Sequence, residues 1–316
     1  MALGICLSSC APAQPCVWIT NQESGTVSVI DSATDRIVDT VQVGGNPAGI
    51  VVAQNGRDVY VTIPATKEVV HLDGIAHTIL KRVALPSEPL GLDLDEAGHR
   101  LLVGEWFGND VAVLDPIRLE VVTRIPVGQA PAGIAVAADG STAWVANRDS
   151  STVSMISLAD YSILATIAVD AHPFGITLSP DGNQAWVAAV KANVVTVIDI
   201  DQRRVVRAIP VGRTPYVIAF SVDGDKAYVT NQHDNTVTAI DARTLTPLST
   251  LEVGEYPEGI MAHPDGKRLY VANWMTNTVS VLATAPFAVA TTLRTGNGSR
   301  SFGRFLGDTQ RSCPKE

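Results

Sequence analysis

Two histidines and two glutamates form the set that comes closest to catalytic or metal-binding chemistry in this chain. His172, His233, Glu105 and Glu258 could supply imidazole and carboxylate groups to a metal ion or to acid–base catalysis. The sequence has no Gly-x-Ser-x-Gly nucleophile motif, no phosphate-binding loop and no cysteine pair spaced for zinc. Whether these four side chains meet depends on the elements that carry them.

A repeat of 42 residues organises those elements. Proline, glycine and valine recur in one register without gaps. The recurring residues are Pro47, Pro89, Pro131, Pro173, Pro215 and Pro257; Gly56, Gly98, Gly140, Gly182, Gly224 and Gly266; and Val27, Val69, Val111, Val153, Val195, Val237 and Val279. A period of roughly 40–45 residues with four strand signals is typical of a β-propeller blade.

Each repeat contains four strand signals separated by turns. In one repeat they cover residues 131–137, 142–147, 152–156 and 162–169, and the first two are separated by Asp139-Gly140, a hairpin signal. We name the four strands A to D from the axis outward. The pattern predicts an all-β, seven-bladed β-propeller with four antiparallel strands per blade. A parallel β-helix or open solenoid fits less well, because its repeats are shorter and it needs no ring closure.

The two ends of the repeat region predict how the ring closes. Residues 17–21 read as a strand B, and residues 302–306 read as a strand A that no strand B follows. One blade would then combine N-terminal strands B, C and D with a C-terminal strand A, which removes both unpaired edges. Ser299 keeps the proline register, but Phe302-Gly303 comes about two residues late.

Positions where the copies differ are the candidates for function. We call the face with the D–A and B–C loops the upper face, and the mouth of a closed barrel-like fold is the default ligand site. Trp18, Trp144 and Trp186 share one strand B position and are interpreted as packing residues. The candidate rim residues are Glu88, Glu105, Trp106, Arg148, His172, Phe174, Tyr216, His233, Tyr256, Glu258, Trp274 and Arg300. The competing interpretation is a solvated loop rim with scattered polar side chains.

Composition limits the classes of partner. The chain has 316 residues, a net charge of −9 and a pI near 5.1, and no basic stripe that would favour nucleic acid. No apolar stretch reaches the roughly 18 residues that span a bilayer. We expect residues 17–316 to form a single domain and a monomer that needs no cofactor.

The first 16 residues differ from the rest and resemble an export leader. They are apolar and then small, without charge, and they lack the usual positive start, so the natural start can lie upstream of Met1. Leu7-Ser-Ser-Cys10 resembles a lipoprotein box, in which Cys10 would be lipidated. A leader without function is the alternative. Export predicts a periplasmic or secreted protein, with or without a lipid anchor.

Two cysteines flank the predicted closure. Cys16 precedes the first strand B, and Cys313 follows the last strand A by about seven residues. If those strands share a blade, both cysteines lie on the lower face, and an oxidising compartment would preserve a disulfide between them. The alternative is a free thiol at Cys313.

The strand B and strand C motifs resemble the YVTN-family propeller repeat. The resemblance rests on Val-Trp-Ile-Thr-Asn21, Ala-Trp-Val-Ala-Asn147, Ala-Tyr-Val-Thr-Asn231 and Leu-Tyr-Val-Ala-Asn273, with Thr-Val-Ser-Val-Ile-Asp31. It is similar to secreted bacterial members, some of which accompany quinone-dependent (PQQ) alcohol catabolism. The resemblance implies a propeller, an extracytoplasmic location and a binding or scaffold role, without a reaction. We therefore expect an exported, non-enzymatic protein that binds a protein or small ligand at its upper rim. The alternative is a lyase or lactonase at the channel mouth.

Overall fold

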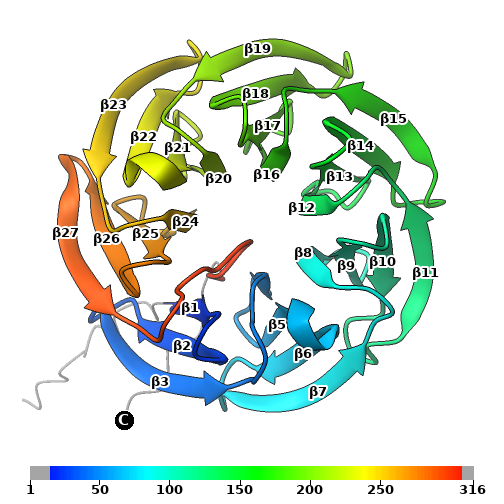
Figure 1. Ribbon diagram of the computed structural model, residues 1–316, viewed down its shortest axis with the longest axis horizontal. Helices are drawn as coiled ribbons and strands as arrows, with labels where there is room; N and C mark the ends of the chain where they lie inside the picture. The colour runs from blue at the N-terminus through cyan, green and yellow to red at the C-terminus, as the bar shows by residue number, and fades with distance from the viewer. Residues whose placement is uncertain (1–14, 308–316) are drawn as a thin grey trace, which may run out of the picture.

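Seven β-sheets surround a central axis in the computed structural model, which describes residues 15–307 (Figure 1). The first sheet contains β1 (Cys16–Asn21), β2 (Thr26–Asp31) and β3 (Arg36–Gln42). The next two contain β4 (Ile50–Val52), β5 (Asp58–Ile63), β6 (Glu68–Asp73) and β7 (Thr78–Ala84), then β8 (Pro89–Asp95), β9 (Arg100–Glu105), β10 (Asp110–Leu114) and β11 (Val121–Pro126).

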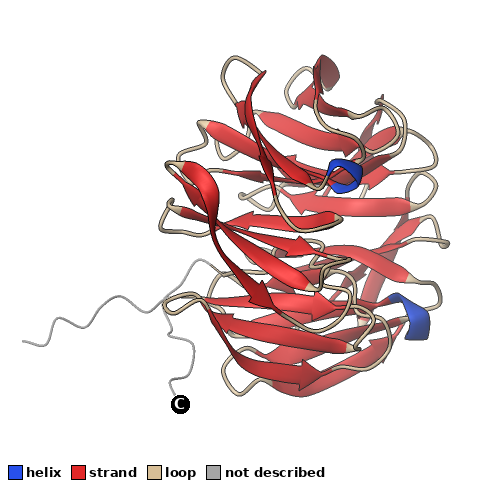
Figure 2. Ribbon diagram, turned by 60° about the vertical axis from the view of Figure 1, so that its left-hand side comes forward, coloured by secondary structure: helices blue, strands red, loops and turns tan. Residues whose placement is uncertain are grey.

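The remaining four sheets continue the same order. They contain β12 (Pro131–Val136), β13 (Thr142–Asn147), β14 (Thr152–Ser157) and β15 (Ile163–Ala168); β16 (Pro173–Leu178), β17 (Gln184–Ala189), β18 (Val194–Asp199) and β19 (Arg204–Pro210); β20 (Pro215–Phe220), β21 (Lys226–Asn231), β22 (Thr236–Asp241) and β23 (Thr246–Glu252); and β24 (Pro257–Ala262), β25 (Arg268–Asn273), β26 (Thr278–Thr284) and β27 (Phe287–Arg294). Two short 3-10 helices, η1 (Pro64–Thr66) and η2 (Gln232–Asp234), lie in loops (Figure 2).

The predicted all-β propeller with antiparallel four-stranded blades is confirmed. Six sheets have four strands in chain order, and the innermost strand of each is the predicted strand A (Figure 1). The hairpin between β12 and β13 turns at Gly140, whose φ of 67° lies in the left-handed region that glycine tolerates. Within residues 15–307, no helix is long and apolar enough to cross a membrane.

The C-terminal segment completes the three-stranded first sheet, as predicted. Trp18 N–H donates to Phe305 O at 2.9 Å, and Arg300 N–H donates to Thr20 O at 2.8 Å. Antiparallel bridges join Val17 to Leu306 and Asn21 to Ser299. The segment therefore takes the place of strand A beside β1, and no edge of the ring is left unpaired there.

Two extra residues in this segment explain its irregular register. In the preceding blade, Pro257 pairs with Asn273, and Ala262, five residues later, pairs with Leu269. At the closure, Ser299 pairs with Asn21, but the equivalent second pair uses Leu306, seven residues later. The surplus shifts the segment inward, and Figure 1 shows it in red reaching toward the axis.

The inserted segment also bonds to the blade that follows it in the ring. Ile50 N–H donates to Phe302 O at 2.9 Å, and Val52 N–H donates to Arg304 O at 2.7 Å. The segment thus joins β4 as well as β1, so the closure connects two blades.

Neighbouring blades approach closely at the axis because strand A carries glycine. A Cβ atom on Gly91 would lie 1.8 Å from Ala132 O, and one on Gly133 would lie 2.5 Å from Phe174 O. Both carbonyls belong to the next blade. Any side chain at these positions would push the inner strands apart.

The predictions for the two chain ends concern residues outside the described range. Cys10 and Cys313 are not among residues 15–307, so the lipidation, the leader and the disulfide with Cys16 stay predictions.

We expect Trp144→Ala to lower the free energy of unfolding by about 3–5 kcal/mol. Trp144 is fully buried in the apolar layer between two blades, as Trp18 and Trp186 are in theirs, so truncation leaves a cavity. Chemical denaturation measures the loss. Phe107→Ala is the control, because Phe107 is 72% exposed and should change stability little. Equal losses in the two variants would contradict the packing role.

Candidate functional site

Three aromatic side chains lie together where the channel meets the upper face. We call Phe174 of β16, Tyr216 of β20 and Phe302 of the C-terminal segment the aromatic plug. The rings of Phe174 and Tyr216 stack at 4.1 Å, and that of Phe302 is 4.9 Å from Phe174. Their exposures are only 5%, 7% and 4%. The sequence placed Phe174 and Tyr216 on an accessible rim, and that placement was wrong, because the shifted segment brings Phe302 over them.

A buried ion pair supports the plug. Arg300 Nε lies 2.7 Å from Glu258 Oε2, and Arg300 Nη2 donates to Tyr216 Oη at 2.6 Å. Gln232 Nε2 donates to Glu258 Oε1 at 2.7 Å. Burial raises the pKa of the Glu258 carboxyl, while the Arg300 guanidinium opposes the rise. Glu258 and Arg300 were predicted as rim residues, but here they engage each other.

Glu105 is also buried, away from the predicted rim. Its carboxylate lies 2.9 Å from Arg124 Nε of β11, the outermost strand of the same blade, and accepts a hydrogen bond from Ser87 N–H at 3.0 Å. In four other blades this position is asparagine; Asn147 Nδ2, for example, donates to Ser154 Oγ at 2.9 Å. Glu105 therefore occupies the position of this asparagine and, like it, binds a strand farther from the axis in its own blade.

Asp110 shares the Glu105 environment. Burial and the neighbouring Glu105 carboxylate raise the pKa of Asp110 to about 6, although Arg124 opposes the rise. The Arg124 guanidinium thus contacts the carboxylates of both Glu105 and Asp110, with Arg124 Nε 3.9 Å from Asp110 Oδ2.

Three predicted residues stay on the upper face beside the plug. The Arg148 guanidinium lies 5.8 Å from the centre of the Trp106 ring, a cation–π distance, and that ring is 6.2 Å from Phe174. Partial burial lowers the pKa of His172, and the charges of Arg148 and Lys191 add to the effect.

Three of the other predicted residues form a second group, and Glu88 has a separate partner. The His233 ring lies 5.2 Å from that of Tyr256, which lies 6.1 Å from Trp274. Glu88 is ion-paired with Lys67 at 3.3 Å. Among residues 15–307, no three His, Cys, Asp or Glu side chains are placed to hold a metal ion. The set of His172, His233, Glu105 and Glu258 is therefore not assembled.

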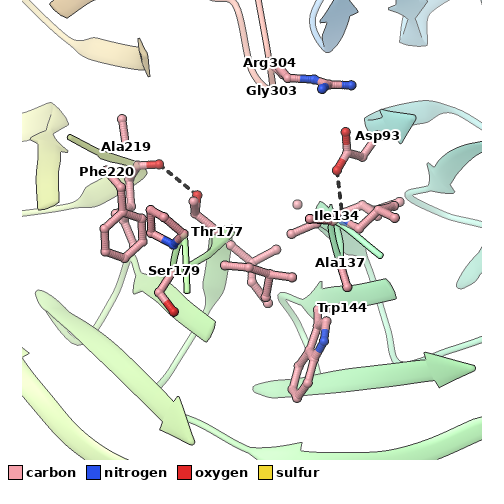
Figure 3. Close-up of a pocket in the computed structure, with 18 of the residues that line it drawn as sticks. Asp93, Ile134, Ala137, Trp144, Thr177, Ser179, Ala219, Phe220, Gly303 and Arg304 are labelled. Carbon is pink, nitrogen blue, oxygen red and sulfur yellow. Dashed lines mark hydrogen bonds between the residues drawn. The ribbon is translucent and has the colours of Figure 1, made fainter. Parts of the chain in front are cut away.

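A cavity along the axis lies below the plug, where the sequence predicted no site. It encloses about 1240 Å³, and residues of the A–B hairpins line it at the lower face. Figure 3 shows part of its wall. Phe302 lies at its closed end. Its apolar walls include Leu92, Ile134, Ile176, Phe220 and Met261, and its polar groups include Asp93, Glu96, Thr177 and Arg304.

One sequence signal could have pointed to this cavity. Asp93 pairs with strand B at a position where the other blades have Val51, Ala135, Thr177, Ala219 and Met261. Asp93 is the carboxylate in this row of small and apolar side chains. Asp93 departs from the repeat inside strand A, whereas the predicted rim residues lie at strand ends and in loops.

Comparisons with known proteins agree on the fold. Residues 135–226 match the YNCE-like beta-propeller family. No curated protein matches the chain. A functionally unknown protein from Desulfotomaculum acetoxidans has a similar structure, with a TM-score of 0.80, 16% identity, and coverage of 90% of this chain and 99% of its own.

Two enzymes also contain similar propellers. Dihydro-heme d1 dehydrogenase NirN, in complex with DHE, has a TM-score of 0.69 at 18% identity and coverage of 88% of this chain and 63% of its own. Hydrazine synthase from Kuenenia stuttgartiensis has a TM-score of 0.56 at 20% identity, with coverage of 76% and 96%. At these identities the likeness shows the fold alone.

We expect Asp110→Asn to stabilise the protein at neutral pH by about 1 kcal/mol, after allowance for solvent screening. The folded-state pKa is raised to about 6, so the native state holds this proton more tightly than the unfolded chain. The stability it contributes is full at low pH and is lost as pH rises through about 6.

Melting temperatures measured across this pH range test the sign. The gain of Asp110→Asn over the parent should be largest above pH 7 and shrink toward pH 4. Asp201→Asn, at an exposed site, is the control. A gain that is equal at both ends of the range would contradict the argument.

We expect Tyr216→Phe to cost about 1–3 kcal/mol of stability, because the buried Arg300 guanidinium loses an acceptor. Denaturant unfolding at neutral pH measures the loss. Tyr256→Phe serves as the matched control on the upper face, since Tyr256 is half-buried outside the plug. If both substitutions cost the same, the Arg300 bond contributes nothing to stability.

Proposed function

We propose that this chain is an exported, non-enzymatic binding protein whose central channel takes a small molecule with a large apolar surface. The cavity of about 1240 Å³ below the aromatic plug carries this proposal. It opens at the lower face, and Phe302 lines its closed end, so the ligand enters from the A–B hairpins.

The shape and lining of the cavity support binding. Ligand sites are concave, mostly apolar and carry a few polar groups that orient the ligand. Ile134, Ile176 and Phe220 supply apolar wall, and Thr177 is a polar side chain among them (Figure 3). Thr177 Oγ1 already donates to Ile218 O at 2.8 Å, so that hydroxyl strengthens the wall.

The state of the predicted acid–base groups favours binding over catalysis. Glu105 is held by Arg124, and Glu258 is held by Arg300 and Gln232. Both carboxylates are buried in structural networks at a distance from the open end of the channel. The lyase or lactonase alternative thus loses the carboxylates on which it depended.

Location and assembly are part of the proposal. The apolar, uncharged leader and the resemblance to secreted YVTN-repeat proteins support a periplasmic or secreted monomer. The D–A and B–C loops with Trp106, His172 and Trp274 stay available for a protein partner on the upper face.

Filling the cavity should abolish ligand uptake. We expect the protein to bind Nile red, a neutral dye that fluoresces in apolar surroundings, and Ala137→Trp at the cavity wall to weaken binding at least about tenfold by occlusion. Fluorescence titration measures the affinity.

Ala192→Trp is the matched control, because Ala192 lies in a B–C loop on the opposite face. It should leave dye binding unchanged. Failure of the parent to bind the dye, or equal losses in the two variants, would count against a channel site.

A further inference from the structure

Asp93 is a carboxylate of the cavity wall that no cation among residues 15–307 contacts directly. Asp93 accepts hydrogen bonds from Val136 N–H at 2.9 Å and from Leu94 N–H at 2.8 Å. Within residues 15–307, no lysine, arginine or histidine lies within 4.0 Å of its carboxylate. The direct partners of the carboxylate are therefore backbone amides.

The positive group of the cavity is already committed elsewhere. Among the described residues that line it, Arg304 alone carries a positive charge, and Arg304 Nη2 donates to Glu96 Oε1 at 3.1 Å. Glu96 also accepts a hydrogen bond from Gln54 N–H at 2.6 Å, which fixes it in the hairpin. Figure 3 shows Arg304 and Asp93 on neighbouring parts of the wall without a bond between them.

The remaining acidic groups at this end are paired or capped. Asp95 lies 2.5 Å from Arg100 Nη2. Asp139 and Asp181 accept hydrogen bonds from the backbone of their own turns, at 2.9 Å and 3.1 Å. Asp93 thus differs from Asp139 and Asp181, which are exposed, in its depth, and from Asp95 in having no arginine partner. Apolar side chains form the wall beside it.

Leaving a carboxylate in such a wall is unfavourable unless something compensates it. Burial raises the pKa of the Asp93 carboxyl, and the charge of Arg304 opposes the rise. A divalent metal ion would need further ligands, and none is assembled among residues 15–307. An ammonium group supplies one positive charge and N–H donors at a single point.

We infer that the channel selects amphipathic organic ammonium compounds, with the ammonium group bound at Asp93 and the apolar body against Ile134, Ile176 and Phe220. This inference rests on the proposed function of the same cavity and names the class of ligand it takes. The position of Asp93 in a row of Ala135, Thr177, Ala219 and Met261 makes the charge specific to one side of the channel.

A matched series of ligands tests the inference. 4-Phenylbutylamine, 4-phenylbutanol and 5-phenylvalerate share the same phenylbutyl body, and at about pH 8 their head groups are positive, neutral and negative. Calorimetric titration should show the amine binding at least about tenfold more tightly than the alcohol, with the carboxylate weakest. Asp93→Asn should remove the advantage of the amine and leave the affinity for the alcohol unchanged.

Two further variants keep the test decisive if Asp93→Asn fails to fold. Arg304→Gln removes the positive charge near Asp93, so the affinity for the amine should rise several-fold while that for the alcohol stays constant. Asp223→Asn makes the same change in net charge as Asp93→Asn, but in a lower-face hairpin at a position outside the cavity lining, and should shift the affinity for the amine less than about twofold.

The outcomes separate the two proposals. If the parent protein binds none of the three compounds, the channel site and this inference both fall. If it binds the alcohol as tightly as the amine, the channel site stands and the ammonium preference falls. Loss of amine binding in Asp223→Asn equal to that in Asp93→Asn, or no response to Arg304→Gln, would also overturn the inference.

Discussion

The pairing of the C-terminal segment with β1 is the interaction on which the rest of the structure depends. Every other blade is formed by strands consecutive in the chain, so hairpins hold it together locally. The closing blade alone joins residues almost 290 positions apart, through Trp18 N–H to Phe305 O and Arg300 N–H to Thr20 O. Bonds from Ile50 and Val52 attach the same segment to the next blade. These contacts convert a row of sheets with two open edges into a ring, and only a ring has a channel.

The departure from repeat symmetry at this point also creates the asymmetry of the channel. The two extra residues after Ser299 carry Phe302 to the axis, where it meets Phe174 and Tyr216 from other blades. Arg300 and Glu258 then brace the plug from beneath the upper loops. The aromatic plug thereby fills the upper end of the channel. The cavity remains below it. The irregular repeat therefore closes the upper end of the channel.

The repeat made the fold predictable, because a period in proline, glycine and valine reports backbone geometry directly. Strand order, the closure and the buried tryptophans followed from it.

The upper-face site could not be predicted in the same way. Whether Tyr216 or Glu258 faces solvent depends on a partner such as Arg300, whose register the two extra residues change. Glu105 was misplaced because its arginine lies in the outermost strand, 19 residues later. Asp93 was not predicted because it lies within a strand. It lines a cavity only once the ring of blades has closed.

The closing segment has a further consequence for the order of events during synthesis. Residues 299–306 emerge from the ribosome after all the other strands of the ring, and they supply both the last strand and Phe302. The earlier blades can therefore stack on one another as they appear, while the pore stays open along its whole length. Ring closure and the completion of the binding chamber are then a single event. A nascent chain that lacks residues 299–306 therefore has neither a closed ring nor a closed end to its channel.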